Sequence, residues 1–315
     1  MRLYAITFAV VSLLLPVTVF SQTQTPEAAI NHFKNGVKKT GTGDLDGAIE
    51  DYTRAIRLSS RFDTRKDTAP RSGNSFAGSD EITVIDPFTA NAYTNRGLAR
   101  YQKGDYAGAL EDFDEALKIR PGLAIAYLNR GAALRASGDL KGALQALDRA
   151  ISLDKNFFQA YNNRGSLHMD LGDNKAAITD LNRAIELNKR SADSFYHRGY
   201  AKLGLKEFDN AIADFDGAIK VEPDMAWAYQ GRGTAWMYKG TMLRAIDDFN
   251  RALELDPQLA WAYFNRGLVW VFLGDEDKAQ NDFTDCLRLR PDLKAQLDPR
   301  IELARQLRRM GKIEE

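Results

Sequence analysis

The chain has 315 residues, 44% of them hydrophobic, and it balances 43 Lys and Arg against 43 Asp and Glu. This composition fits a soluble globular chain that can bury an extended core. It argues against a nucleic-acid-binding protein, because binding to phosphates depends on an excess of Lys and Arg.

Residues 1–21 differ in character from the rest of the chain. Arg2 is followed by an apolar run from Leu3 to Phe20, and small residues stand near Ser21. This pattern predicts a secretory signal peptide over residues 1–21, and hence an exported protein, periplasmic or secreted. The alternative is an uncleaved membrane anchor, although the run is short for a bilayer span and contains Pro16. No membrane contact is expected beyond this segment.

Residues 22–58 match, at several positions, a repeat that is clearer further along the chain. Gly36, the pair Gly43-Asp44, Ala48 and Tyr52 fall in its register. Because a terminal repeat has solvent on one side, atypical residues are expected there, and His32 is interpreted as a polar edge residue.

Residues 59–87 interrupt the repeat. They contain many turn-forming residues and have no apolar periodicity over most of their length. This composition predicts an inserted loop. The loop is either a mobile linker or a segment folded over the inner face of the repeats.

Residues 88–293 contain six consecutive repeats with a period of 34 residues. An aromatic residue, two variable residues, Arg and Gly recur with the glycine at Gly97, Gly131, Gly165, Gly199, Gly233 and Gly267. Small and large apolar residues then follow at spacings of three, four and seven, which lie on one helical face. Gly-Asp pairs such as Gly104-Asp105 interrupt four of the six runs, and prolines such as Pro121 close four of them. Each repeat is therefore predicted to be a helical hairpin.

This pattern resembles the tetratricopeptide repeat family, whose repeats have the same period and a similar order of aromatic, small and proline residues. The resemblance covers nearly the whole chain after the signal segment. It implies an all-α fold, a right-handed α-solenoid of tetratricopeptide helical hairpins. Residues 294–315 are predicted to form a C-terminal capping helix, with Ile301, Ala304, Leu307 and Met310 on one face and Pro299 ending a short segment before it. A basic helix lying on an anionic membrane is the alternative.

The chain departs from the family pattern in two ways. Where the family usually has Leu before the repeat glycine, this chain has Arg96, Arg130, Arg164, Arg198, Arg232 and Arg266. Five of these repeats also carry an Asp before the large apolar residue, namely Asp112, Asp180, Asp214, Asp248 and Asp282. The spacing predicts a ladder of Arg–Asp ion pairs where helices meet. A basic row for an anionic ligand is the alternative. In the hairpin after Gly199, Lys206-Glu207 replaces Gly-Asp, which predicts a weaker turn.

Nothing in the sequence indicates catalysis. The three histidines, His32, His168 and His197, are scattered over three repeats, and no phosphate-binding loop, nucleophile motif or metal-ligand spacing occurs. His197 is interpreted as a polar groove residue rather than a catalytic one. Cys286 is the sole cysteine, so no internal disulfide can form, and its place in the repeat predicts core filler rather than a reactive thiol. We therefore expect no enzyme activity, no cofactor and no metal site.

In the tetratricopeptide family the first helix of each hairpin lines a concave groove that receives peptides. The resemblance places the groove positions five and two residues before the repeat Arg, and two, five and six residues after it. In the N-terminal half these positions include Asn91, Thr94, Ile125, Leu128, Gln159 and Asn162. In the C-terminal half they include Tyr196, Tyr200, Trp227, Met237, Tyr238, Trp261, Phe264 and Phe272. Aromatic residues dominate binding hot spots, so this half favours an apolar or aromatic segment of a partner. Alternatively, Trp227 and Trp261 stack against neighbouring helices.

Two functional hypotheses follow from these observations. The first is a non-catalytic scaffold for protein–protein interaction, which binds a peptide or helical segment of a partner protein in the concave groove. The alternative is a self-associating structural array in the cell envelope, and hence a homo-oligomer.

Overall fold

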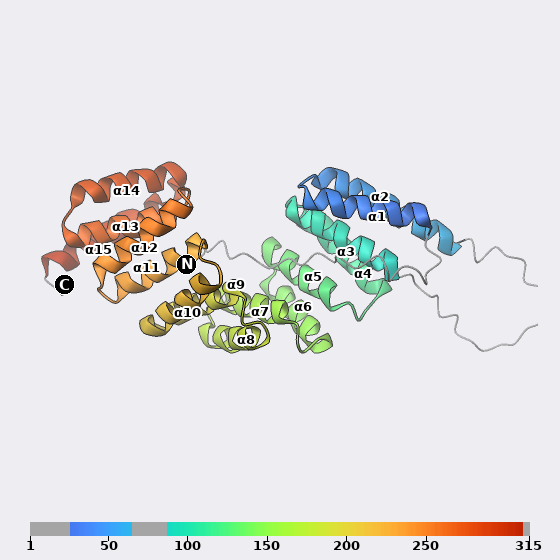
Figure 1. Ribbon diagram of the computed structural model, residues 1–315, viewed down its shortest axis with the longest axis horizontal. Coiled ribbons are helices and arrows are strands. Elements are labelled where there is room, and N and C mark those ends of the chain that lie inside the picture. Colours follow the sequence, from blue (N-terminus) through green and yellow to red (C-terminus); the bar gives the residue numbers. More distant parts are fainter. Residues whose placement is uncertain (1–25, 65–86, 311–315) are drawn as a thin grey trace, which may run out of the picture. The chain divides into compact units, whose positions relative to one another are not determined.

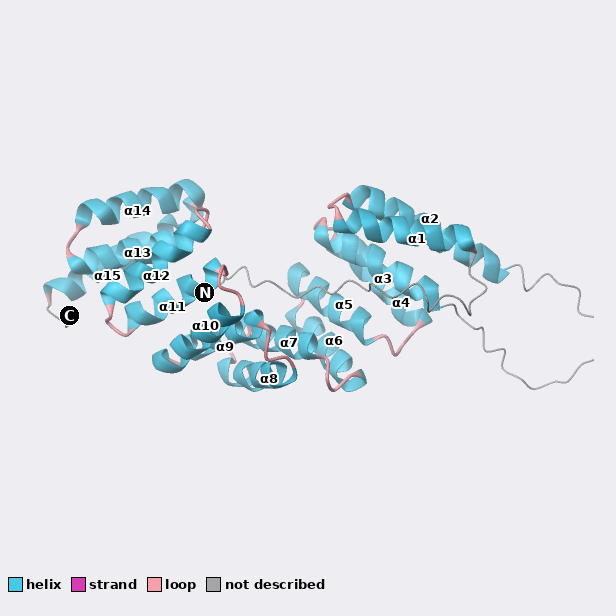
Figure 2. Ribbon diagram, in the orientation of Figure 1, coloured by secondary structure: helices cyan, strands magenta, loops and turns pink. Residues whose placement is uncertain are grey.

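The computed structural model describes residues 26–64 and 87–310, and these residues form helices joined by short connections, with no strand among them (Figure 2). Fifteen α-helices follow one another in this part of the chain, as seven successive pairs and a final helix (Figure 1). The predicted all-α fold of helical hairpins is confirmed.

The helices have regular lengths, as the constant period requires. The first helices of the pairs are α1 (Glu27–Gly41), α3 (Pro87–Gln102), α5 (Ala124–Ser137), α7 (Phe158–Asp170), α9 (Ala192–Gly204), α11 (Ala226–Tyr238) and α13 (Ala260–Leu273). The second helices are α2 (Leu45–Thr64), α4 (Tyr106–Ile119), α6 (Leu140–Leu153), α8 (Asn174–Leu187), α10 (Phe208–Val221), α12 (Met242–Leu255) and α14 (Glu276–Leu289). The 3-10 helix η2 (Pro291–Leu293) leads into α15 (Lys294–Arg309).

Two details of these bounds differ from expectation. Helix α2 continues to Thr64, beyond the residue 58 at which the first repeat was predicted to end. Helix α15 runs through Pro299, which was predicted to end a short segment. Proline removes one helical hydrogen bond, and the contacts of Leu297 and Ala304 with the core hold the helix on both sides of it. Residues 1–21 of the predicted signal segment, and 65–86 of the predicted insertion, lie outside the described residues.

The chain divides into two compact units. Unit 1 ends at Leu167 and holds α1 to α6 with most of α7, and unit 2 begins at His168 and holds the helices from α8 onward.

Within a hairpin, the repeat glycine allows the second helix to approach the first. A Cβ added to Gly97 would lie 2.8 Å from the ring of Phe113, and one added to Gly199 would lie 2.8 Å from the ring of Phe215. These rings are fully buried, so the glycine and the large apolar residue fill one space together. The close approach of the two helices therefore depends on glycine at these positions.

The turns between paired helices depend on glycine and aspartate. Gly104 has a positive φ of 83° and ends the first helix, and the carboxylate of Asp105 accepts a hydrogen bond from the Gly108 amide at 2.9 Å. The same cap occurs at Asp44, Asp139, Asp173 and Asp275. Each carboxylate satisfies an amide that the helix start leaves without an internal partner.

The turn between α9 and α10 uses a lysine where its counterparts use glycine. Lys206 has a φ of 62°, and it is the one non-glycine residue with a positive φ in the described part of the chain. A side chain in this left-handed region meets the following carbonyl group, which costs free energy. In addition, the side chain of Glu207 makes no capping hydrogen bond at the start of α10. The sequence prediction of a weaker turn therefore has a backbone cause.

The last helix, α15, packs on α13 and closes the apolar core of unit 2. Leu293, Leu297 and Ala304 are buried in one cluster with residues of α12, α13 and α14. At its far end, Arg305 pairs with Glu276 at the start of α14, at 2.6 Å. One face of α15 is therefore apolar and buried, while its other faces carry charges, as a terminal helix of a repeat array requires.

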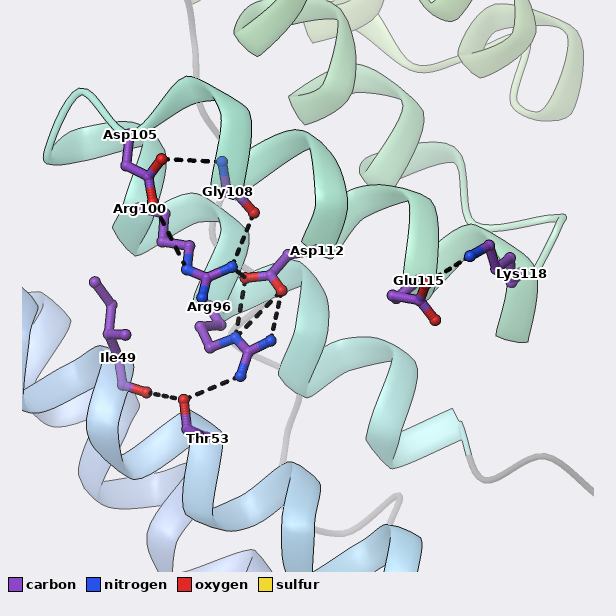
Figure 3. Close-up of polar contacts among 9 residues, drawn as sticks. All are labelled: Ile49, Thr53, Arg96, Arg100, Asp105, Gly108, Asp112, Glu115 and Lys118. Atoms are coloured by element: carbon purple, nitrogen blue, oxygen red, sulfur yellow. Dashed lines mark hydrogen bonds and ion pairs between the residues drawn. The ribbon is translucent and has the colours of Figure 1, made fainter.

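The repeat arginine forms the predicted ion pair within its own hairpin. The Arg96 guanidinium donates to both oxygens of Asp112, with its Nη2 atom 2.6 Å from Oδ1, and Arg100 adds a second contact (Figure 3). Equivalent two-point pairs join Arg198 to Asp214, Arg232 to Asp248 and Arg266 to Asp282. The ladder prediction is confirmed in these four repeats.

The same arginine also contacts the preceding hairpin, which the sequence analysis did not foresee. The Nη1 atom of Arg96 donates to the Thr53 hydroxyl at 3.0 Å, and that hydroxyl in turn donates to the Ile49 carbonyl (Figure 3). Every later repeat arginine donates to the residue sixteen positions earlier, namely Asp114, Asp148, Asn182, Asp216 and Asn250. In the four repeats with two-point pairs, one guanidinium therefore links the second helix of its own hairpin to the second helix of the preceding hairpin.

We expect Lys206→Gly to raise the free energy of unfolding by about 1 kcal/mol, because relief of the left-handed strain outweighs the added chain entropy of glycine. The midpoint of urea unfolding, followed by circular dichroism, measures the change. Lys220→Gly is the matched control, since Lys220 is exposed within α10 and glycine there should cost about 1 kcal/mol. A lower midpoint for Lys206→Gly would contradict the strain at this turn.

We expect Arg232→Leu to lower the free energy of unfolding by about 2–3 kcal/mol, because Asp248 would stay buried without its partner. Burial raises the pKa of the Asp248 carboxyl, and the Arg232 guanidinium opposes that rise. Urea unfolding of this variant is compared with that of Arg251→Leu, which breaks the exposed pair with Glu254 and should cost about 0.5 kcal/mol or less. Equal losses in the two variants would show that the ladder is only a surface feature.

Candidate interaction surface

The predicted groove positions of unit 2 lie on the first helices α9, α11 and α13, and we call them the inner positions. They number fifteen by the spacing from the repeat Arg, and are residues 193, 196, 200, 203 and 204 of α9, residues 227, 230, 234, 237 and 238 of α11, and residues 261, 264, 268, 271 and 272 of α13. The eight aromatic and methionine residues predicted as the binding site all belong to this set.

Four of those eight predicted residues are part of the core. Tyr196 and Tyr200 are each 5% exposed, Met237 is buried, and Phe264 is fully buried. The Tyr200 ring packs edge-on against Phe215, with the ring centroids 5.2 Å apart. Neighbouring residues of the repeat array cover these four side chains. They therefore support the surface residues and are not themselves accessible to a partner.

The other four predicted residues remain accessible, and we call Trp227, Tyr238, Trp261 and Phe272 the aromatic face. Tyr238 is 56% exposed, and its ring stacks on that of Phe208 with centroids 5.8 Å apart. The two tryptophans and Phe272 are partly buried and pack against the core of unit 2. Each presents an aromatic ring that is fixed on one side and open on the other.

Both sequence interpretations of the tryptophans therefore describe part of their position. Trp227 packs against the core clusters on either side of it, as the stacking alternative proposed. The Trp261 ring lies 5.0 Å from that of Phe264. Neither packing arrangement buries the side chain fully.

A buried hydrogen-bond network joins successive first helices beneath the aromatic face. The Tyr200 hydroxyl donates to the Gln230 side chain at 2.6 Å, and the Gln230 amide donates to the Thr234 hydroxyl at 3.1 Å. Asn265 also donates to Thr234, at 3.1 Å. This network links α9, α11 and α13 and fixes their spacing. Sequence reasoning missed it, although polar residues at the otherwise aromatic inner positions 230 and 234 were a signal.

The corresponding positions of unit 1 offer a different surface. Asn91, Thr94, Leu128 and Asn162 are buried, Ile125 lies at the edge of burial, and Gln159 is partly exposed. No aromatic residue stands among these six positions, although the same spacing also gives Tyr101, which is partly exposed on α3. The accessible aromatic residues at predicted groove positions that could hold a partner by stacking are therefore concentrated in unit 2.

The repeat arginines do not form a basic row for an anion. In the four repeats with a two-point pair, a carboxylate holds the guanidinium, and the remaining Nη1 atom donates to the preceding hairpin. Because these donors are already used, the structural interpretation of the arginines is favoured over ligand binding.

The three histidines are structural. His197 is 1% exposed beside the ring of Tyr196, and His168 lies 3.8 Å from Asp180. His32 contacts Asp51 at 2.9 Å, where Lys39 also pairs with that carboxylate. Burial works to raise the pKa of Asp51, but these hydrogen bonds outweigh it and lower the pKa. In the described residues, no group of three or more His, Cys, Asp or Glu is arranged to hold a metal ion.

Cys286 occupies a core position in α14. Its side chain is fully buried, and burial raises the pKa of its thiol to about 11. The prediction that Cys286 is a core residue is confirmed by its position, and because the thiolate is the reactive form, we expect the thiol to react slowly.

Comparisons with known proteins agree on the repeat. Family models described as tetratricopeptide repeat match residues 90–123, 196–260 and 262–293, and one described as TPR repeat matches residues 131–172 and 165–205. Tetratricopeptide repeat protein 36 of Mus musculus is 34% identical over 96 residues, which cover 29% of this chain and 37% of that protein. The chain therefore matches little more than a third of that relative's length.

Two solved structures show the same kind of fold. A tetratricopeptide repeat protein from Parabacteroides merdae is similar with a TM-score of 0.63 and 18% identity, covering 89% of this chain and 99% of that chain. The pilF protein of Pseudomonas aeruginosa is similar with a TM-score of 0.57 and 19% identity, covering 64% of this chain and 92% of that chain. Within the described residues, no helix combines the length and the apolar character needed to cross a bilayer.

We expect Cys286 to react with Ellman's reagent far more slowly in the folded protein than in urea. At pH 8, a thiol of pKa about 11 has a thiolate fraction on the order of 200-fold below that of an unperturbed cysteine. Cys286→Ala combined with Thr284→Cys places a thiol on the exposed side of the same helix, and that thiol should react rapidly. Fast modification of native Cys286 would indicate that α14 opens.

Proposed function

The chain belongs to the tetratricopeptide repeat family, and on that premise we propose that it is a scaffold which binds a segment of a partner protein on the aromatic face of unit 2. Membership of this family supports a protein-interaction scaffold in general. The partner segment and its place on α9, α11 and α13 are the specific content of the proposal.

One observation carries this proposal, which is the partial exposure of large aromatic side chains on consecutive first helices. Trp227, Trp261 and Phe272 are held by core contacts on one side, and Tyr238 is mostly exposed. Rigid aromatic rings lose little conformational entropy when a partner packs on them, and Trp and Tyr are enriched among residues that dominate binding energy. The hydrogen-bond network from Tyr200 to Asn265 keeps the spacing of the rings constant, so the face is formed before binding.

The proposal includes the absence of catalysis. The histidines are buried or paired with carboxylates, the sole cysteine is buried, and the repeat arginines serve the ladder. Within the described residues, we therefore assign these side chains to packing and recognition rather than to catalysis. We also propose that the protein acts outside the cytoplasm, on the strength of the signal-like residues 1–21.

Self-association is the second candidate, and it has a separate observation in its favour. Leu243 is 71% exposed at the start of α12, and Leu303 of α15 and Met310, which follows α15, are also exposed. Exposed apolar side chains of this size are candidates for contact with a second copy of the chain.

We expect a photoreactive amino acid at Tyr238 to crosslink a partner protein that the same amino acid at Lys118 does not. Lys118 is a matched control because it is exposed on α4, away from any inner position. Trp261→Ala, tested with the crosslinker at Tyr238, should abolish capture by removing another ring of the aromatic face, and thermal unfolding checks that the variant is folded.

Light scattering of the uncrosslinked protein separates the two candidates. A constant monomer mass, together with capture at Tyr238 alone, supports partner binding. Self-association replaces partner binding if three results agree. These are a mass that rises with concentration, a crosslinked product that contains only the protein itself, and a lower mass for Leu243→Ser. Equal capture at Tyr238 and Lys118 counts against the aromatic face.

A further inference from the structure

The inner positions of unit 2 are almost free of charge, and the one charge that they carry is negative. Of the fifteen inner positions, none is Lys or Arg, and Asp193 is the one acidic residue. A partner held there meets aromatic rings, aliphatic side chains and a single carboxylate. The chain as a whole has equal numbers of positive and negative residues, so this bias is local.

Asp193 lies beside the aromatic part of the surface. It is partly buried in the first turn of α9, three residues before Tyr196 and so on the same helical face. Trp227, which occupies the same position one repeat later, packs against the cluster that contains Tyr196 and Tyr200. Burial raises the pKa of Asp193, and the negative charge of Glu222 adds to that rise. The partly desolvated Asp193 carboxylate, with the negative charge of Glu222 nearby, therefore favours the approach of a positive group.

The protein already places a cation on one of these inner aromatic residues. The guanidinium of Arg300, from α15, lies over the Phe264 ring at 5.3 Å from its centroid. This contact buries Phe264 at the end of the array and is a cation–π interaction of ordinary length. Trp227 and Trp261, which lie five residues before their repeat Arg rather than two, keep part of their surface accessible.

We propose that the partner segment recognised by unit 2 carries an Arg or Lys side chain, which pairs with Asp193 while adjacent apolar residues of the segment pack on Trp227 and Trp261. This inference rests on the proposed function and adds the charge of the partner to it. A carboxylate next to aromatic rings binds both the positive head and the aliphatic stem of such a side chain. An acidic segment would place like charges together at Asp193 and Glu222 and is excluded by the same arrangement.

Asp193 also has a structural role that the experiment must separate from recognition. A carboxylate in the first turn of a helix stabilises that helix through its dipole. Asp193→Asn removes the charge at little change in shape, and Asp193→Glu keeps the charge in the same turn. Thermal unfolding of the three proteins measures the helix effect by itself.

The test is selection of random short peptides, displayed on phage, against the immobilised full-length chain and its variants. We expect peptides selected by the unmodified chain to be enriched in Arg and Lys beside apolar residues. Asp193→Asn should lose this enrichment and still select apolar peptides, while Asp193→Glu should retain it. For a selected peptide, replacing its Arg by citrulline, or Asp193 by Asn, should weaken binding by roughly three- to tenfold, measured by fluorescence anisotropy.

The outcomes separate this inference from the proposed function. Peptides whose binding depends on Trp261 and Tyr238 but that show no excess of Arg and Lys, or an excess of Asp and Glu, overturn the inference and leave the scaffold proposal standing. Selection of no peptide that depends on Trp261 or Tyr238 overturns both. An unchanged Arg and Lys enrichment with Asp193→Asn assigns Asp193 to helix stability alone and overturns its role in recognition.

Discussion

The structure depends on one repeated interaction, the set of hydrogen bonds that the guanidinium of the repeat arginine makes. In each of the four fully paired repeats it holds a buried Asp of its own hairpin by two hydrogen bonds, and it reaches the preceding hairpin with a third. An aromatic ring three residues earlier lies under the same group, as Tyr229 does for Arg232 at 5.4 Å. A single side chain thus sets both the crossing of two helices and the spacing to the next pair, which explains why arginine recurs where an aliphatic residue would serve packing alone.

This arrangement leaves the first helices free to differ. The repeat arginines and glycines recur at fixed positions, whereas the residues at the inner positions differ between the two units. Unit 1 places mostly polar and aliphatic side chains there, with Tyr101 as the partly exposed aromatic residue, whereas unit 2 places several aromatic rings over a buried polar network. The accessible rings of Trp227, Tyr238, Trp261 and Phe272 and the carboxylate of Asp193 are the result. The proposed partner-binding face therefore lies on the first helices that also carry the repeat arginines.

Most of the fold could be predicted because its causes are local. The period, the Gly-Asp turns and the large residue sixteen positions after each glycine all act within one hairpin, so the spacing in the sequence maps directly onto the spacing in space. The continuation of α15 through Pro299 could not be predicted in the same way. The local preference of proline is to end a helix, and only the contacts of Leu297 and Ala304 with the core of unit 2 outweigh it.

The sequence alone determined the repeat, the helical hairpins, the glycine and aspartate turns, and the pairing of Arg96, Arg198, Arg232 and Arg266 with the aspartate of their own hairpins. Tertiary structure decided which of the predicted aromatic residues reach the surface. Tyr196, Tyr200 and Phe264 were predicted on the same surface as the accessible rings, but neighbouring helices and α15 cover them. Exposure depends on elements that are distant in the sequence, and so does the contact from each arginine to the hairpin before it. The period fixes where a side chain lies on its helix, and only the packing of whole hairpins fixes what lies against it.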